Sequence, residues 1–214
     1  MRRLPRPLGE VEIRVLGSLL EKEQATPAYY PMTLNSVTQA CNQKSNRSPV
    51  LDLSGSEVQA ALDSLFSQDV FVWRSRAGRT TKWSHNVDRR WQMRPASKAV
   101  MTLLLLRGPQ TIGALRSRSD RLHAFTDLSA VEQALESLSS GEDPLVRELP
   151  RQPGQKESRW THLVGDGASV APTIPEMAAP SSGGKDRLAQ LETRVAELER
   201  LVAGLSPESS RRRC

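Results

Sequence analysis

The feature that most constrains the fold is a repeated order of elements, in which three helical segments are followed by a strand-rich segment. The stretch DLSGSEVQAALDSL at 52–65 resembles DLSAVEQALESL at 127–138, with two more residues in the first copy. Both stretches space their apolar residues so that one helix face is buried. We therefore expect an internal duplication with a period of about 75 residues.

In the first copy, apolar periodicity predicts helices that begin near residue 10, at 34 and at 54. Thr33 is the expected N-cap of the second of these helices. The β-branched and aromatic run at 70–87, with Gly78 at its centre, predicts a β-hairpin. The second copy repeats this order. Its helices are expected near 97–108, 110–119 and 127–141, and two strands follow.

Three helices and a hairpin are the elements of a winged helix, in which the second and third helices form a helix-turn-helix and the hairpin is the wing. The predicted fold is mainly α with small β-hairpins (α+β): two tandem winged-helix domains plus a C-terminal heptad helix. We place the domains at 9–92 and 95–165. The flanking segments are a flexible basic arm at 1–8, a flexible linker at 166–184, a short coiled-coil helix at 185–205 and a disordered tail at 206–214.

Near the C-terminus, apolar residues alternate at spacings of three and four. The six heptad positions are Leu188, Leu191, Val195, Leu198, Val202 and Leu205. Apolar residues at a and d with charged residues between them favour a parallel coiled coil, and so a homodimer. Three heptads are short, and a solitary amphipathic helix or a frayed tail is the alternative.

The charge, the cysteine content and the lack of long apolar runs indicate which cellular compartment suits the protein. The chain has 214 residues, a formal net charge of +6 and two cysteines, Cys41 and Cys214. Two cysteines so far apart build no disulfide framework, which favours a reducing compartment. The N-terminal MRRLPRPLGE lacks the apolar stretch of a signal peptide, and no apolar run approaches the roughly 18 residues of a membrane span. We expect a soluble, cytoplasmic protein that does not enter a membrane.

The central region carries specific motifs. The segment LGSLLEKEQATPAYYPMTLNSVTQACNQKSNRSPVLDLSGSEVQAALDSL contains Glu-Lys-Glu, Tyr-Pro-x-Thr-Leu-Asn and Ala-Cys-Asn-Gln-Lys-Ser-Asn-Arg. In these motifs it resembles the YceH-like family of uncharacterised bacterial proteins, and the resemblance extends over about residues 9–165. The resemblance implies a tandem winged-helix fold, with a C-terminal coiled coil in some members. It implies no activity, because none is established for the family.

Cys41, in the stretch ACNQKSNRSPV, is the first candidate for catalysis. A nucleophilic cysteine needs a nearby base and a lowered pKa. Cys41 instead follows Leu34 and Val37 on the apolar stripe of the second helix, so we interpret it as a core residue. The three histidines lie far apart in the sequence without metal-ligand spacing, and no phosphate-binding glycine loop is present. We expect no enzymatic activity, no metal and no cofactor.

Basic residues gather on the first hairpin and on the turn after the second helix. The candidate nucleic-acid-binding residues are Lys44, Asn46, Arg47, Arg74, Arg76, Arg79 and Lys82. Such arrays can hold phosphates, although a solvated charged surface is an equal alternative. We expect Arg74, Arg76 and Lys82 to share one face of the hairpin. The aromatic residues are expected on its other face: Phe71, Trp73 and Trp83.

The third helix of each copy opposes this interpretation. In a winged helix that reads DNA, this helix enters the major groove. Here its outward side has no Lys or Arg, and Asp63 in the first copy and Glu132 and Glu136 in the second are acidic. The leading hypothesis is therefore a nucleic-acid-associated or regulatory protein that uses its wing and turn. The alternative is a protein–protein assembly module without DNA binding, whose protein partner is unknown.

Overall fold

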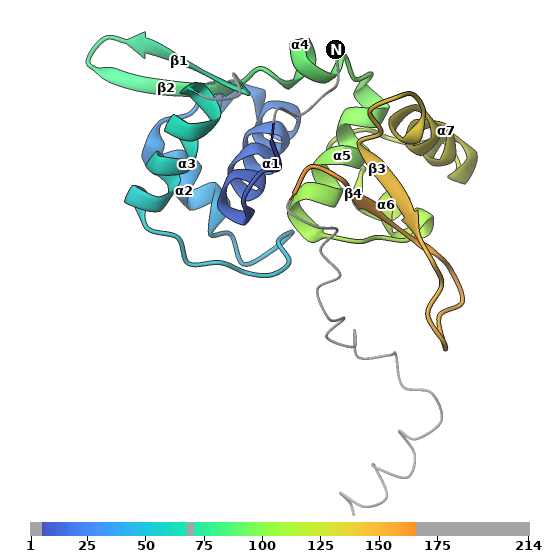
Figure 1. Ribbon diagram of the computed structural model, residues 1–214. Helices are drawn as coiled ribbons and strands as arrows, with labels where there is room; N and C mark the ends of the chain where they lie inside the picture. Colours follow the sequence, from blue (N-terminus) through green and yellow to red (C-terminus); the bar gives the residue numbers. More distant parts are fainter. Residues whose placement is uncertain (1–5, 68–70, 166–214) are drawn as a thin grey trace, which may run out of the picture. The chain divides into compact units, whose positions relative to one another are not determined.

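The computed structural model describes residues 6–67 and 71–165. Among these, the first repeat contains α1 (Glu10–Ala25), a short 3-10 turn η1 (Pro27–Tyr29), α2 (Leu34–Cys41), α3 (Gly55–Ser67), β1 (Val72–Ala77) and β2 (Thr80–His85). After α4 (Val87–Trp91), the second repeat contains α5 (Pro95–Arg107), α6 (Ile112–Arg118), α7 (Leu128–Ser139), β3 (Val146–Leu149) and β4 (Arg159–His162). Each hairpin is a two-stranded antiparallel sheet, and the two hairpins project on different sides of the helices (Figure 1).

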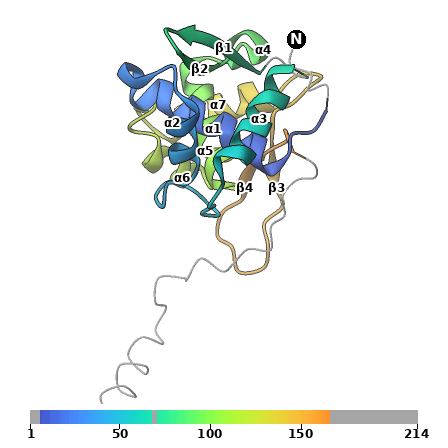
Figure 2. The same cartoon turned by 90° about the vertical axis from the view of Figure 1, so that its left-hand side faces the viewer.

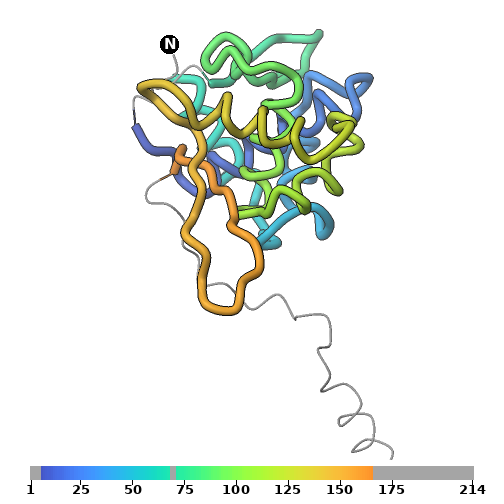
Figure 3. The backbone as a smooth tube through the Cα atoms, turned by 90° about the vertical axis from the view of Figure 1, so that its right-hand side faces the viewer, coloured from blue at the N-terminus to red at the C-terminus, as the bar shows by residue number. Residues whose placement is uncertain are grey.

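The predicted α+β class is confirmed, and the order of three helices and a hairpin occurs twice. That the two repeats are winged helices stays a prediction, as do the boundaries between them. The structure adds the helix α4, which the sequence did not suggest, directly after the first hairpin. In Figure 3 the hairpin β3–β4, in orange, extends well past the helices of its own repeat.

Backbone hydrogen bonds at matching places support the internal duplication. The amide of Phe71 donates to the carbonyl of Leu65 at 2.9 Å, and the amide of Leu145 donates to that of Leu138 at 2.8 Å. Leu65 and Leu138 are the residues that align in the two copies of the repeated stretch. A second matching pair follows, because Asn86 donates to Phe71 as Leu163 donates to Leu145. Each hairpin is therefore attached to its third helix in the same way.

The second helices also begin alike. The side chains of Thr33 and Thr111 accept hydrogen bonds from the amides of Ser36 and Ala114, so both are N-caps. The residue before each cap makes an isolated antiparallel bridge to a tryptophan in the second strand of the hairpin. These bridges join Met32 to Trp83 and Gln110 to Trp160. The hairpin is thus attached at the start of the second helix as well as at the end of the third.

The two repeats meet along their first helices, α1 and α5, and share one hydrophobic core. The described residues belong to one compact unit. Gly17 of α1 marks the closest approach, because a Cβ there would lie 2.9 Å from Leu106 Cδ2 and 3.1 Å from Leu105 Cβ. Glycine therefore allows the two helices to pack closely.

The expectation of a flexible arm over 1–8 is wrong at its described end. The amide of Leu8 donates to the carbonyl of Val164 at 2.7 Å, and the Leu8 side chain is buried. Arg6 makes an ion pair of 2.6 Å with Glu12 of α1. Leu8 is thus attached to the end of the second repeat, and Arg6 is attached to α1.

The predicted linker at 166–184, heptad helix at 185–205 and tail at 206–214 lie outside the described residues, so these assignments stay predictions. The six heptad residues, Leu188 to Leu205, fall within that part of the chain. Among the described helices, none combines the length and the hydropathy that crossing a membrane would require.

Candidate nucleic-acid interface

The first hairpin (β1–β2) carries most of the candidate residues, and its strand register fixes which of them share a face. Arg74 pairs with Trp83 and Arg76 with Thr81, so these four residues form one face, the Arg74 face. The other face, the Trp73 face, is formed by Trp73, Ser75, Lys82 and Ser84. The two-residue turn begins at Gly78, whose φ of 62° suits a tight hairpin turn, and places Arg79 at the tip.

The expected sorting of the hairpin into a basic and an aromatic face is wrong. Lys82 lies on the face opposite Arg74 and Arg76, and Trp83 lies on the same face as Arg74. The expectation assumed a strand register in which Trp73 and Trp83 share one face of the hairpin. A two-residue turn between Ala77 and Thr80 instead puts Trp73 and Trp83 on opposite sides of the sheet. Each face therefore combines cations with an aromatic ring.

On the Arg74 face, the guanidinium of Arg74 lies 5.0 Å from the centre of the Phe66 ring of α3. Phe66 packs edge-on against Trp83, which is buried. Arg74, Arg76 and Arg79 are exposed, and in the described part of the chain none of them makes an ion pair with an acidic residue. Arg74 and Arg76 border a shallow depression that Ser75 and Thr81 also line.

On the Trp73 face, the residue Trp73 is 40% exposed. The guanidinium of Arg89, from α4, lies 4.8 Å from the centre of the Trp73 ring. A cation over a tryptophan face is a favourable cation–π contact. The helix α4 follows the base of the hairpin in Figure 1, and Figure 2 shows both at the same end of the molecule. The sequence does not indicate that Trp73 and Arg89 are paired, because the five-residue helix that brings them together is too short to show a periodicity.

A charged network fixes the base of this hairpin. His85, the last residue of β2, has its Nε2 2.8 Å from Glu23 Oε2 of α1. The ammonium of Lys98, from α5, lies 2.9 Å from a carboxylate oxygen of both Glu23 and Asp88. The network therefore joins the hairpin, α1, α4 and α5. No spacing in the sequence reveals it, because its members come from four elements.

The contacts within the network shift the pKa of Glu23 and of Lys98. The hydrogen bonds from His85 and Lys98 outweigh burial and lower the pKa of Glu23 from 4.5 to about 2. Burial alone would lower the pKa of Lys98, but its bonds to Asp88 and Glu23 raise that pKa above its usual value. Glu23, His85 and Asp88 are close enough together to ligate a cation. The Lys98 ammonium, however, already supplies the positive charge between the two carboxylates.

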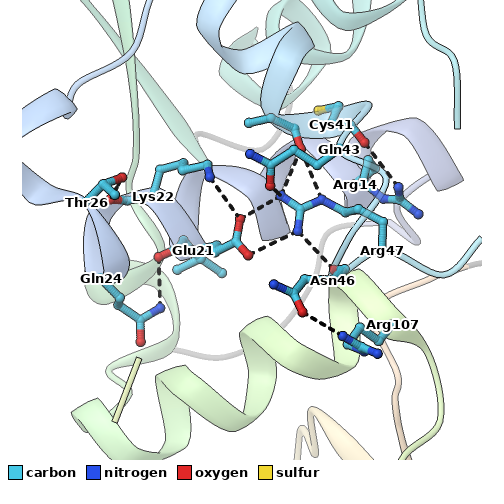
Figure 4. A network of polar contacts seen from close by, with 12 residues as sticks. Arg14, Glu21, Lys22, Gln24, Thr26, Cys41, Gln43, Asn46, Arg47 and Arg107 are labelled. Carbon is cyan, nitrogen blue, oxygen red and sulfur yellow. Dashed lines mark hydrogen bonds and ion pairs between the residues drawn. The ribbon is translucent and has the colours of Figure 1, made fainter. Parts of the chain in front are cut away.

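Arg47 is not a phosphate contact in this structure, which corrects the expectation for the turn after α2. Its side chain is fully buried, and its guanidinium binds Glu21 Oε2 of α1 at 2.6 Å (Figure 4). It also donates two hydrogen bonds to the carbonyl of Ala40. A buried guanidinium with this many acceptors is a structural ion pair. No local spacing marks it, because Glu21 lies 26 residues earlier.

The rest of the turn joins the two repeats. The amide of Ser48 donates to the carbonyl of Leu106 in α5 at 2.9 Å. Arg107 donates to Asn46 Oδ1 at 2.8 Å, so Asn46 is engaged across the repeats although it is exposed (Figure 4). Of the three candidate residues in this turn, only Lys44 is exposed without a hydrogen bond or ion pair in the described part of the chain.

The third helices show the acidic outer faces that the sequence suggested. Asp63 of α3 and Glu132 and Glu136 of α7 are exposed. The buried positions of the two helices are equivalent: Val58, Ala61, Leu62 and Leu65 in α3, and Val131, Ala134, Leu135 and Leu138 in α7. Neither helix offers a cation to a phosphate along its outer side.

Cys41 is a core residue, as the apolar stripe indicated. It is fully buried, and burial raises the pKa of its thiol. Arg14 of α1 donates a hydrogen bond to the backbone carbonyl of Cys41 at 3.2 Å. A thiol with a raised pKa and no exposure is a poor nucleophile.

Comparison with known proteins places the chain in a family. The model of DUF480, a protein family of unknown function, matches residues 8–155. UPF0502 protein GSU0233 of Geobacter sulfurreducens is 49% identical, over 92% of this chain and 90% of its own length. A UPF0502 protein of Geotalea daltonii is 46% identical, over 90% and 87%. UPF0502 protein azo0627 of an Azoarcus species is 45% identical, over 92% and 89%. The expectation of an uncharacterised bacterial family is confirmed, and the chain belongs to the DUF480 family.

Proposed function

We propose that this protein is a non-enzymatic, tandem winged-helix protein that binds nucleic acid through its first hairpin. The observation that carries the proposal is the exposure of Arg74, Arg76 and Arg79 on a projecting hairpin, without acidic partners among residues 6–67 and 71–165. A group of exposed cations without neighbouring acids creates a positive surface potential, and Arg side chains commonly contact phosphates. Lys82 lies on the opposite face of this hairpin, and Lys44 lies in the turn after α2.

The acidic third helices set the mode of binding. A helix with Asp63 or Glu136 on its outer side is repelled by phosphates, so affinity has to come from the hairpin. Such binding depends on the backbone rather than on base edges in the major groove. We therefore expect weak sequence preference and a strong dependence on salt.

We also propose that the protein is not an enzyme, because its candidate catalytic side chains, Cys41 and His85, are engaged in the fold. The one nucleophile that the sequence singled out, Cys41, is buried with a raised pKa. The histidine with carboxylate neighbours, His85, is held in an ion network at the base of the hairpin. Nδ1 of His85 accepts from the Val87 amide at 3.3 Å, so this imidazole serves to position α4 after the hairpin.

The test is binding of a labelled oligonucleotide at low salt, measured by fluorescence anisotropy. The variant is Arg74→Ala/Arg76→Ala/Arg79→Ala. The matched control removes three cations from the second hairpin, as Arg147→Ala/Arg151→Ala/Lys156→Ala. We expect at least a tenfold loss of affinity in the first variant and a much smaller change in the control. No binding by the wild type, or equal losses in both variants, would refute the proposal.

The acidic outer faces of α3 and α7 favour a second candidate, a protein–protein assembly module. A basic partner protein would fit Asp63, Glu132 and Glu136, which are exposed. A homodimer through the predicted heptads is a separate part of this candidate. Truncation after Gly184 is expected to give a monomer if those heptads pair. If the truncated chain keeps the oligomeric state of the full-length chain in light scattering, the predicted pairing is contradicted.

A further inference from the structure

The Trp73 face of the first hairpin has the parts of a stacking site for an unpaired base. We propose that this face binds single-stranded nucleic acid, with a base stacked on the Trp73 indole and the neighbouring phosphates held by Arg89 and Lys82. The inference rests on the proposed function and names its substrate class. Three observations carry it: the exposure of the indole, the cations around it and the rigidity of its support.

The indole is unusual in its exposure. Trp83 and Trp91 are fully buried and Trp160 is half-buried, whereas Trp73 is 40% exposed. Tryptophan is normally mostly buried, because its large apolar surface is costly to leave in water. An exposed, flat aromatic ring on a cationic surface is the arrangement on which bases stack in proteins that bind single strands.

Two cations, Arg89 and Lys82, lie next to the Trp73 indole and can bind the phosphates of a strand that stacks there. Arg89 lies over the ring at 4.8 Å, and Lys82 is a diagonal neighbour of Trp73 across the hairpin. Ser75 and Ser84, on the same face, offer hydroxyl groups. Duplex DNA hides its bases inside the stack, so an indole can contact only an unpaired base without opening the helix. The ring therefore favours a single strand over a duplex.

The support under the ring is rigid, so the site is formed in advance. Arg90, next to Arg89, lies 5.3 Å from the centre of the buried Phe71 ring, which anchors α4 to the start of the hairpin. Asp88 of the same helix binds Lys98 of α5 at 2.9 Å. Arg89 is thus presented by a helix that is held on both sides, and a preformed site loses little conformational entropy on binding.

The experiment compares three probes of equal length, about 16 units: oligothymidylate, an abasic strand with the same phosphates, and a duplex. The variants are Trp73→Ala and Trp73→Phe, and the control is Tyr29→Ala, which removes an aromatic ring that is 81% exposed outside the hairpin. We expect Trp73→Ala to bind oligothymidylate about tenfold more weakly, Trp73→Phe to keep most of the affinity and Tyr29→Ala to be unchanged. The abasic strand should bind wild type and Trp73→Ala equally.

Other outcomes distinguish the stacking site on the Trp73 face from the proposed binding of nucleic acid by the first hairpin. If Trp73→Ala binds oligothymidylate as well as the wild type does, or if the duplex binds more tightly than the single strand, the stacking site is refuted. The proposed function survives that result when Arg74→Ala/Arg76→Ala/Arg79→Ala still weakens binding. If no probe binds the wild type at low salt, both proposals fail. Far-ultraviolet circular dichroism and the thermal midpoint confirm that each variant is folded.

Discussion

Replacing Arg47 by alanine should destabilise the fold rather than weaken any binding. The change removes a fully buried guanidinium and leaves the Glu21 carboxylate, whose side chain is 12% exposed, without its main partner. It also deprives the Ala40 carbonyl of two hydrogen bonds. Breaking a buried ion pair from one side typically costs about 3–5 kcal/mol. We expect a loss in that range in the free energy of unfolding.

The assay is urea denaturation, followed by tryptophan fluorescence at neutral pH. Lys44→Ala is the matched control, because it removes an exposed cation from the same turn and should change stability by less than about 0.5 kcal/mol. Arg47→Lys should recover only part of the loss, since an ammonium cannot make the two-pronged contact with Glu21. If Arg47→Ala is as stable as Lys44→Ala, Arg47 is not held in a buried ion pair. Arg47 would then again be a candidate for contact with phosphate.

Other parts of the structure lead to further expectations. Gly17→Val should lower the free energy of unfolding by about 1–3 kcal/mol, because it overpacks the contact between α1 and α5; a thermal midpoint equal to the wild type would contradict this packing. In a Cys214→Ser background, Cys41 should react with a thiol reagent only as fast as the protein unfolds, and fast labelling of the folded protein would show that the thiol is accessible. Burial lowers the pKa of His162 from 6.5 to about 4, so its neutral form stabilises the fold above pH 6.5 and that contribution is lost as the pH falls toward 4. Glu23, whose pKa falls from 4.5 to about 2, loses its contribution between those values. When the urea midpoint is measured against pH, His162→Phe should reduce its change between pH 6.5 and 4, and Glu23→Gln should reduce its change between pH 4.5 and 2. If a variant keeps the wild-type pH dependence in its range, the pKa shift given for that residue is refuted.

The elements of the fold could be predicted because their signals are local. Apolar spacing marks α3 and α7, and Thr33 and Thr111 mark the starts of α2 and α6 through hydroxyl groups that cap the next turn. The burial of Cys41 followed from the same spacing. These signals act within one turn of a helix, so a single sequence is enough to read them.

The candidate site could be predicted only in part, because its geometry depends on contacts between distant residues. The exposure of Arg74 and Arg76 followed from their place in a polar hairpin, but the face of Lys82 depended on the turn length, since one residue reverses every side chain. The burial of Arg47 depended on Glu21 in another helix. The Trp73 and Arg89 pair depended on α4, a helix too short to show a period.

The salt dependence of nucleic-acid binding tests the central claim most directly. Each phosphate contact contributes about 0.7 for single strands, and about 0.9 for duplexes, to the slope of log affinity against log salt. If Arg74, Arg76 and Arg79 each hold a phosphate, their joint replacement by alanine should reduce the slope for oligothymidylate by about 2. The three-cation variant of the second hairpin should keep the wild-type slope. Binding with an unchanged slope in the Arg74→Ala/Arg76→Ala/Arg79→Ala variant would contradict a role for the first hairpin in holding phosphates.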